Sequence, residues 1–365
     1  MKLLFVTQVL DRRDAVLGFV TRWVEGLSRE VEGLRVLALE VGDVSGLPDN
    51  VDVREIGRRG TLRRYLRYRR YLSEAFGEGF DGLLTHMVPR YSTLAAGAAR
   101  RARAKHFLWY THKGVDQRLL SALKVVDGAF TASELSLRVD TPKKIVTGHG
   151  IDLGHFDVGP AESGLQGDGL DDAKRPARLL SVGRLTPAKD PLTTVEALAL
   201  LREWGHRVTL RWAGAGLARG DDAYADGVKA RIRDLGLVED VHLAGAVPYP
   251  EVPAAFRSAD LFINASGTGS VDKVVLEAMS ARRPFVSCNE SIPPVLQAAS
   301  RLDAPVSAFQ FKAGSATSLA ESLEGWLTRT LDDRRAVGDQ LRRIVAEHHE
   351  VDALMARLVR RIGEA

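Results

Sequence analysis

Cysteine is nearly absent from this sequence, because Cys288 is the only one among its 365 residues. A single cysteine excludes an internal disulfide and a zinc site built from cysteines, and it fits a reducing compartment. Long apolar runs are also missing, since none approaches the roughly 20 residues that a membrane-spanning helix needs. The apolar start, residues 1–7, is too short for a signal peptide and predicts a first strand instead. We therefore expect a cytoplasmic protein.

Acidic residues are the minority in the first half of the chain. Residues 1–150 carry 25 Lys and Arg against 17 Asp and Glu, a net charge of +8, and the remainder carries 26 against 30, a net charge of −4. The first half is therefore the part that would meet an acidic partner or surface.

The arginines are densest between Arg58 and Leu72, a segment with helical spacing. The residues expected near one side of this helix are Leu62, Tyr65, Leu66, Arg69 and Leu72. One interpretation is a solvated helix whose aromatic side chains lie over the edge of the core. The alternative is a helix that rests on an anionic membrane, which would place the protein peripherally on the inner face of that membrane. No recognised nucleic-acid-binding module surrounds the segment, so nucleic acid is not expected as a partner.

Short apolar runs alternate with stretches of helical spacing along the whole chain. A chain of 365 residues with 45% hydrophobic and 27% charged residues can bury two ordinary cores, which predicts two domains. The apolar runs lie at residues 3–6, 36–39, 51–56, 82–84, 107–110, 128–131, 145–146, 177–182, 208–213, 259–263 and 284–287. Strands that alternate with helices predict mostly parallel sheets covered on both faces, with ligands beyond the carboxyl ends of the strands.

The stretch between Asn264 and Pro284 is the strongest candidate for a binding site. It has a Gly/Ser/Thr loop between two apolar runs, and this loop opens into a helix expected from Val274 to about Ala281. The first N–H groups of a helix have no partner within the helix, so such a loop can bind an anion. Glu277 falls one turn inside the helix, within reach of a ligand at its start. The pattern alone is equally compatible with a plain strand-to-helix loop and a solvated Glu277.

Four motifs resemble those of the family 4 glycosyltransferases of GT-B type. They are L-E-A-M-S-A-x-x-P-F-V at 276–286, V-G-R-L-x-P-x-K-D at 182–190, W-Y-T-H at 109–112 and G-H-G-I-D-L at 148–153. His149 stands where the last motif of the family commonly has Asn. The family usually also carries E-x(7)-E, of which this chain keeps the second residue as Glu277 and has Gly269 in place of the first. In the family, the first Glu is associated with contacts to the sugar hydroxyls and the second with a contact to the ribose. The resemblance therefore implies that this chain retains the ribose contact and lacks the usual carboxylate near the sugar.

The resemblance implies an α/β fold of two Rossmann-like domains that face each other across a cleft. The expected parts are an acceptor-binding domain at 1–158, a linker at 159–176, a nucleotide-sugar-binding domain at 177–350 and a C-terminal helix at 351–365 that crosses back to the first domain. The implied catalytic residues are His112, Arg184 and Lys189, with His86 as a candidate on the acceptor side. Taken singly, either histidine is more simply a structural residue. The implied donor-binding residues are Gly18, Gly183, Arg184, Lys189, Val247, Gly269, Ser270, Lys273, Val274 and Glu277.

The implied activity is retaining transfer of a hexose from a nucleotide-diphosphate sugar to a glycan, a lipid or a small molecule, as in the synthesis of cell-envelope polysaccharides. No Asp-x-Asp triplet occurs to hold a divalent metal. Fixed cations, Arg184 and Lys189, are therefore expected to stabilise the departing diphosphate without a metal or other cofactor. Gly269 motivates one alternative, a non-catalytic protein that binds a nucleotide or glycan, and a sugar-nucleotide epimerase is another.

Overall fold

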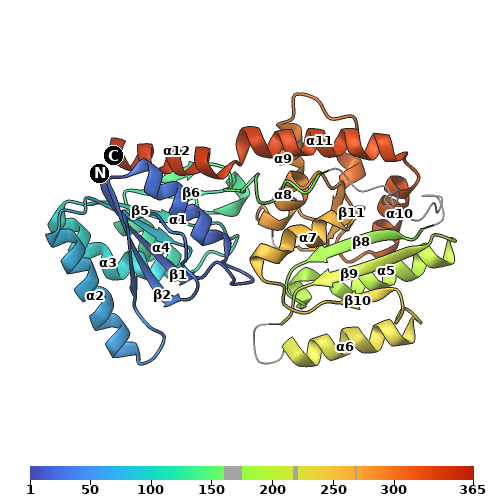
Figure 1. The fold of residues 1–365 in the computed structure, drawn as a ribbon, viewed down its shortest axis with the longest axis horizontal. Coiled ribbons are helices and arrows are strands. Elements are labelled where there is room, and N and C mark those ends of the chain that lie inside the picture. The colour runs from blue at the N-terminus through green and yellow to red at the C-terminus, as the bar shows by residue number, and fades with distance from the viewer. Residues whose placement is uncertain (160–174, 217–220, 268) are drawn as a thin grey trace. The chain divides into compact units, whose positions relative to one another are not determined.

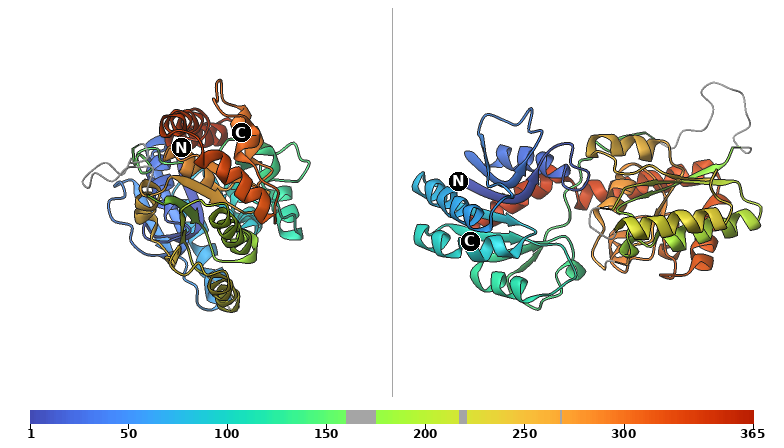
Figure 2. Two further views of the ribbon diagram at one scale, coloured as in Figure 1. Left: turned by 90° about the vertical axis from the view of Figure 1, so that its right-hand side faces the viewer. Right: turned by 90° about the horizontal axis from the view of Figure 1, so that it is seen from below.

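The computed structural model describes residues 1–159, 175–216, 221–267 and 269–365. The chain divides into two compact units. Unit 1 comprises Met1–Asp152, Pro248–Pro250 and His349–Ala365, and unit 2 comprises Leu153–Val247 and Glu251–His348. In both units the strands lie between helices, as the ribbon views show (Figures 1 and 2). The predicted fold class, two Rossmann-like α/β domains, is thereby confirmed.

Unit 1 is built on a seven-stranded parallel sheet with the order β3-β2-β1-β4-β5-β6-β7. Its strands are β1 (Lys2–Leu10), β2 (Gly33–Val41), β3 (Val51–Glu55), β4 (Gly82–His86), β5 (Lys105–Trp109), β6 (Gly128–Thr131) and β7 (Lys144–Val146). Its helices are α1 (Phe19–Glu30), α2 (Thr61–Gly77), α3 (Pro89–Ala102), α4 (Gln117–Val125), α12 (Val351–Glu364) and the 3-10 turn η1 (Glu134–Ser136). Strand β1 extends to Leu10, three residues beyond the first strand predicted at residues 1–7.

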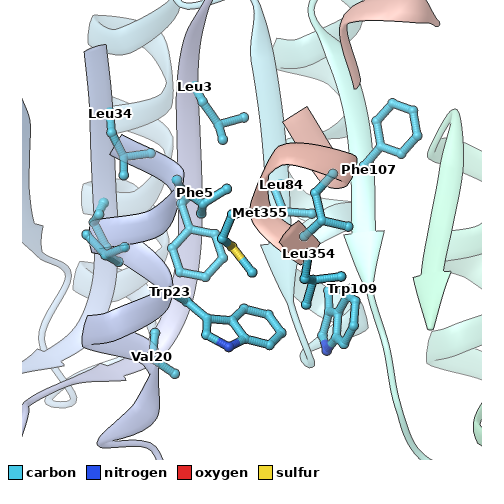
Figure 3. Close-up of a cluster of buried hydrophobic side chains, with 14 of the residues drawn as sticks. Leu3, Phe5, Val20, Trp23, Leu34, Leu84, Phe107, Trp109, Leu354 and Met355 are labelled. Atoms are coloured by element: carbon cyan, nitrogen blue, oxygen red, sulfur yellow. The ribbon is translucent and has the colours of Figure 1, made fainter. Parts of the chain in front are cut away.

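Both faces of this sheet are buried, as a parallel sheet between helices requires. Leu3 and Phe5 of β1 face α1 and α12, whereas Leu4 and Val6 face the cluster formed with α2 and α3. On the first face Trp23 meets Trp109 edge to face, with ring centroids 4.9 Å apart (Figure 3). Successive side chains of one strand therefore supply two separate cores.

Helix α12, at the end of the chain, lies against α1. Arg22 donates two hydrogen bonds to the carboxylate of Asp352, at 2.8 and 2.6 Å. Met355 is fully buried and points into the same core as Trp23 (Figure 3). The two helices approach so closely that a Cβ atom added at Gly26 would lie 2.7 Å from the Cγ of Met355.

Helix α2 buries only its later turns. Tyr68, Leu72 and Ala75 are its buried residues. Leu62 and Leu66, expected near the same side as Leu72, are 69% and 56% exposed. Only the later turns of α2 carry side chains that pack into the core cluster with α3 and the sheet, and the sequence had left the burial of this side open.

Unit 2 contains a five-stranded parallel sheet with the order β10-β9-β8-β11-β12. Its strands are β8 (Ala177–Val182), β9 (Val208–Ala213), β10 (Val241–Leu243), β11 (Leu261–Asn264) and β12 (Phe285–Ser287). Its longer helices are α5 (Pro191–Glu203), α6 (Asp221–Asp234), α8 (Lys273–Ser280), α10 (Ala316–Leu327) and α11 (Leu331–His348). The shorter ones are η3 (Pro187–Lys189), α7 (Val252–Arg257), α9 (Ile292–Gln297) and η5 (Val306–Phe309), and η4 (Tyr249–Glu251) spans the junction of the two units.

Helix α8 begins at Lys273, one residue before the predicted start. Most of the linker expected at 159–176 lies outside the described residues, and the domain limits read from the sequence stay predictions. None of the helices in the described ranges has the length and apolar character that crossing a membrane requires.

We expect Met355→Ala to lower the free energy of unfolding of unit 1 by about 2–5 kcal/mol, because it leaves a cavity where α12 meets α1. Arg360→Ala, on the exposed side of the same helix, is the control and should change it by less than about 0.5 kcal/mol. Urea unfolding followed by tryptophan fluorescence measures both. Equal effects of the two variants would show that α12 does not contribute to this core.

Candidate nucleotide-sugar site

The carboxyl ends of three neighbouring strands of unit 2 carry polar loops. Strand β8 leads into Gly183 and Arg184, β11 ends at Asn264, and β12 ends at Ser287. Parallel strands present these ends at one edge of the sheet, which is the usual place for a ligand in such folds.

The loop after β8 depends on two glycines. Gly183 and Gly214 have φ angles of 153° and 148°. A Cβ atom added at Gly214 would lie 2.0 Å from the carbonyl oxygen of Gly183. That oxygen accepts a hydrogen bond from Nε1 of Trp212 at 2.9 Å, while the Gly183 N–H donates to the oxygen of Ala213 at 2.9 Å. The backbone before Arg184 is thus held by hydrogen bonds on both sides, with no room for a side chain at Gly214.

Lys189 is held in place at the end of the 3-10 turn η3. Its Nζ lies 3.1 Å from Oγ of Ser266 and 3.1 Å from Oδ1 of Asp272. The next residue, Asp190, adopts a left-handed φ of 44° and caps α5 through Thr193. Arg184 by contrast is exposed, and no ion pair of its side chain occurs among the described residues.

Asp272 occupies the N-cap position of α8, but its carboxylate makes no capping hydrogen bond. Instead Oδ1 pairs with Lys189, and Oδ2 accepts from Nδ2 of Asn264 at 3.0 Å. Oδ1 of Asn264 in turn accepts from Oγ of Ser287 at 2.9 Å. This chain of contacts connects the ends of β8, β11 and β12 to the start of α8, whose first N–H groups carry the positive end of the helix dipole.

Glu277 is 6% exposed and lies on α8 one turn after Lys273. The carboxylate of Glu277 and the ammonium of Lys273 form an ion pair within the helix. A ligand hydroxyl that bound Glu277 would therefore meet a carboxylate already oriented by a cation, in a surrounding that excludes most water.

The loop before α8 explains the departure from the usual E-x(7)-E pattern. Gly269 has a left-handed φ of 65°. A residue with a side chain would pay about 1–2 kcal/mol to adopt that conformation. The neighbouring Ser270 is fixed through its carbonyl oxygen, which accepts from Nδ2 of the buried Asn289 at 2.7 Å. Any contact of residue 269 with a sugar would come from its backbone.

Cys288, directly after β12, lies close enough to this cluster for its charges to act on the thiol. Burial raises the pKa of the Cys288 thiol to about 11. The side chain therefore stays protonated near neutral pH and is not a nucleophile. Within the described residues, no three His, Cys, Asp or Glu side chains gather as metal ligands would.

The two candidate histidines belong to unit 1 and differ in burial. His112 is exposed, and its Nδ1 accepts from the Gly114 N–H at 2.9 Å. The backbone N–H of His112 donates to the carbonyl oxygen of Ser136 at 2.8 Å. His86 is 2% exposed and makes a 3.1 Å contact through Nδ1 with Oγ1 of Thr7. Burial lowers the pKa of His86 to about 3, so its ring is neutral at physiological pH.

The remaining candidates lie on loops or at helix starts. Gly18 is the N-cap of α1 in unit 1, and a Cβ atom there would lie 2.6 Å from the carbonyl oxygen of Asp14. In unit 2, Val247 is half-buried after β10, and Val274 lies half-buried in the first turn of α8. The structure therefore brings together Gly183, Lys189, Ser270, Lys273 and Glu277 around the polar edge of the unit 2 sheet.

Four residues of this network were not among those predicted, namely Asn264, Ser266, Asp272 and Ser287. Two signals in the sequence could have found two of them. Asn264 is a polar residue at the end of an apolar strand, and Asp272 is an N-cap type of residue directly before a helix.

Several solved structures superpose on the whole chain. Anabaena Alr3699/HepE in complex with UDP superposes with a TM-score of 0.77 over all of both chains, at 17% identity. Sucrose-phosphate synthase from Thermosynechococcus elongatus gives a TM-score of 0.74 over all of this chain and 99% of the other, at 14% identity. At such identities the likeness establishes the fold, which is GT-B.

Residues 169–343 match the family model Glycosyl transferases group 1. The D-inositol 3-phosphate glycosyltransferase of Segniliparus rotundus is 30% identical over 155 residues, which is 42% of this chain and 34% of that protein. Mannosylfructose-phosphate synthase of Agrobacterium fabrum is 28% identical over 110 residues, 30% of this chain and 24% of that protein. The matches thus span about a third or less of these relatives. The match of residues 169–343 to the glycosyltransferase group 1 model, GT4, confirms the resemblance that the sequence motifs indicated.

Gly214→Ala should strongly disturb the loop before Arg184, because its methyl group would overlap the Gly183 oxygen and its φ of 148° disfavours a side chain. We expect a loss of stability of about 2 kcal/mol or more, measured by urea unfolding. Gly227→Ala is the control, since an added Cβ meets nothing within 4 Å in the middle of α6, and it should stabilise by up to about 1 kcal/mol. A neutral Gly214→Ala would mean that the loop relaxes without cost.

The buried His86 should make the protein less stable in acid. Its folded pKa of about 3 lies below the ordinary 6.5, so below pH 6.5 the unfolded chain binds a proton that the folded chain does not. This contribution to stability is complete above pH 6.5 and falls by about 1.4 kcal/mol per pH unit toward pH 3. Urea unfolding at several pH values should show a shallower acid dependence for His86→Gln than for the parent. The exposed His242, changed to Gln, should leave the dependence unaltered; the same slope in all three proteins would contradict the assignment.

Proposed function

We propose that the protein transfers a hexose from a nucleotide-diphosphate sugar to an acceptor with retention at the anomeric carbon. The observation that supports this most is the placement of Lys189, 3.1 Å from Ser266 and 3.1 Å from Asp272 at the start of α8. Glu277 follows one turn along the same helix. A fixed cation at a helix start, followed by a buried carboxylate, suits the two ends of such a donor, the diphosphate and the ribose.

The diphosphate is the group that gains charge when the bond to the sugar breaks. Lys189 and the first N–H groups of α8 would face it, and the exposed Arg184 has the length to reach it from the loop after β8. Cations and helix ends that are already in place stabilise developing charge without reorganisation. Since the sequence lacks an Asp-x-Asp triplet, we assign this role to the protein's own cations rather than to a metal.

The nucleoside end of the donor would rest on Glu277. Its carboxylate can accept hydrogen bonds from two ribose hydroxyls while Lys273 balances its charge. The main chain around Val247 would line the base pocket. For the sugar hydroxyls we propose backbone contacts at Gly269 and Ser270, because no carboxylate stands at position 269.

The acceptor side is assigned to unit 1. We propose that His112, exposed after β5, approaches the transferred sugar and that Gly18 lets the backbone come close to the donor. His86 is buried, so its contribution there would be to the shape of the core beneath the site. A glycan or lipid-linked acceptor, a role in cell-envelope polysaccharide synthesis and a cytoplasmic location at the membrane are parts of this proposal.

Assays with a panel of nucleotide sugars as donors distinguish the proposed transferase from its alternatives. Anabaena Alr3699/HepE was solved with UDP-glucose, so UDP-glucose is the first donor to test, beside other nucleotide sugars. Transfer of the sugar to an acceptor supports the transferase. Binding without turnover would favour the non-catalytic protein that Gly269 suggests, and conversion of the free donor would favour an epimerase.

Replacing Glu277 and Lys189 should separate affinity from turnover. Glu277→Ala should weaken nucleoside diphosphate and nucleotide sugar alike, by about 10–150-fold, because hydrogen bonds to a charged group contribute about 1.5–3 kcal/mol. Lys189→Ala should lower kcat as well as affinity, since the charge on the diphosphate grows along the reaction. Isothermal titration and initial rates measure both effects.

Two exposed residues of unit 2 provide matched controls for this pair, Glu203→Ala and Lys312→Ala. Neither control should change binding or rate. If Glu277→Ala bound nucleotide as tightly as the parent, the assignment of the α8 start to the donor would be wrong.

A further inference from the structure

The residues just before α2 and the first turns of α2 form the most arginine-rich segment of the sequence. Residues 58–70 contain seven arginines and no Asp or Glu. Arg58 pairs with Glu40, Arg70 pairs with Glu74 at 2.8 Å, and Arg67 donates to the carbonyl oxygen of Ile56 at 2.9 Å. Arg59 and Arg63 are exposed, and no ion pair of either occurs within the described ranges.

Two leucines lie among these arginines and face solvent. Leu62 is 69% exposed and Leu66, one helical turn later, is 56% exposed. The opposite side of α2 is fixed, because Tyr68 and Leu72 are buried and the Tyr68 hydroxyl donates to the carbonyl oxygen of Tyr91 at 3.0 Å. The helix therefore cannot turn its leucines inward without breaking that packing.

We infer that this surface, defined by Arg59, Leu62, Arg63 and Leu66, binds an anionic lipid membrane. The guanidinium groups would contact lipid phosphates, while the two leucines would enter the boundary between headgroups and acyl chains. An apolar pair at the centre of a basic surface has no counterpart in a nucleic-acid backbone.

This surface lies wholly within unit 1 and does not depend on the proposed sugar transfer. A protein without transferase activity would still bind the membrane through it, and an active enzyme could lack it. Failure of one proposal therefore leaves the other standing.

Co-sedimentation of the full chain with vesicles tests the inference. We expect binding to equimolar phosphatidylcholine and phosphatidylglycerol, weakening as salt is raised, and little binding to phosphatidylcholine alone. Arg59→Ser/Arg63→Ser should weaken binding by about 30-fold, since each basic residue near such a surface contributes about 5-fold. Leu62→Ser/Leu66→Ser should weaken it by at least about 10-fold, although it leaves the charge unchanged.

The matched control is Arg118→Ser/Lys124→Ser, which removes the same charge from exposed positions of α4 in the same unit. It should lose no more than about 3-fold of the binding. Equal loss in the control and the α2 variant would overturn the inference, because the net charge of unit 1 would then suffice. Equal binding to neutral and anionic vesicles, or none, would overturn it as well. Unchanged binding of the leucine variant would indicate a general polyanion site, to be identified with heparin, rather than a lipid surface.

Discussion

The ion pair between Lys189 and Asp272 is the contact on which the polar edge of unit 2 depends. The start of a helix is its positive end, so a lysine beside α8 would be repelled if no carboxylate stood next to it. Asp272 supplies that carboxylate 3.1 Å from Nζ, and it does so by leaving the capping position that its place before the helix would normally give it. Through Asn264 and Ser287 the same carboxylate fixes the ends of two further strands. The resulting site places a carboxylate-paired lysine beside the positive end of α8, and an anionic ligand can use this arrangement.

Three glycines determine the path of the backbone around the start of α8 and the loop after β8. Gly214 and Gly183 touch so closely that only a hydrogen fits between them, and Gly269 holds a left-handed turn just before α8. The first pair sets the path of the loop that carries Arg184. Gly269 leaves no side chain at the position where the resemblance implies a glutamate. A donor bound here would therefore be recognised at its phosphates and ribose by side chains, and at its sugar by main chain.

The sequence predicted the strands well, since each apolar run from residues 3–6 to residues 284–287 overlaps a strand of one of the two sheets. Lys189 and Glu277 were predicted from their motifs as donor-binding residues, and the structure places them at the loop after β8 and in α8. The pairing of Asp272 with Lys189 was not predicted, because a residue of N-cap type before a helix ordinarily predicts a cap. His86 and His112 both follow apolar runs, yet one is buried and the other exposed, a difference set by the Phe5 and Trp23 rings around His86. The sequence left the burial of Leu62 and Leu66 open, because helical spacing alone does not tell which turns of a helix pack on the sheet.

Titration of the unmodified protein with uridine, UMP and UDP in the presence of a chelator tests the central claim most directly, namely that the α8 start and Lys189 hold a diphosphate without a metal. The account predicts that affinity rises with each phosphate and falls with salt, because fixed charges and the helix end act on the phosphates. Other bases serve as parallel series if uridine derivatives bind weakly. Equal affinity for nucleoside and nucleoside diphosphate in every series, or binding of the diphosphate only when a divalent metal is added back, would contradict it.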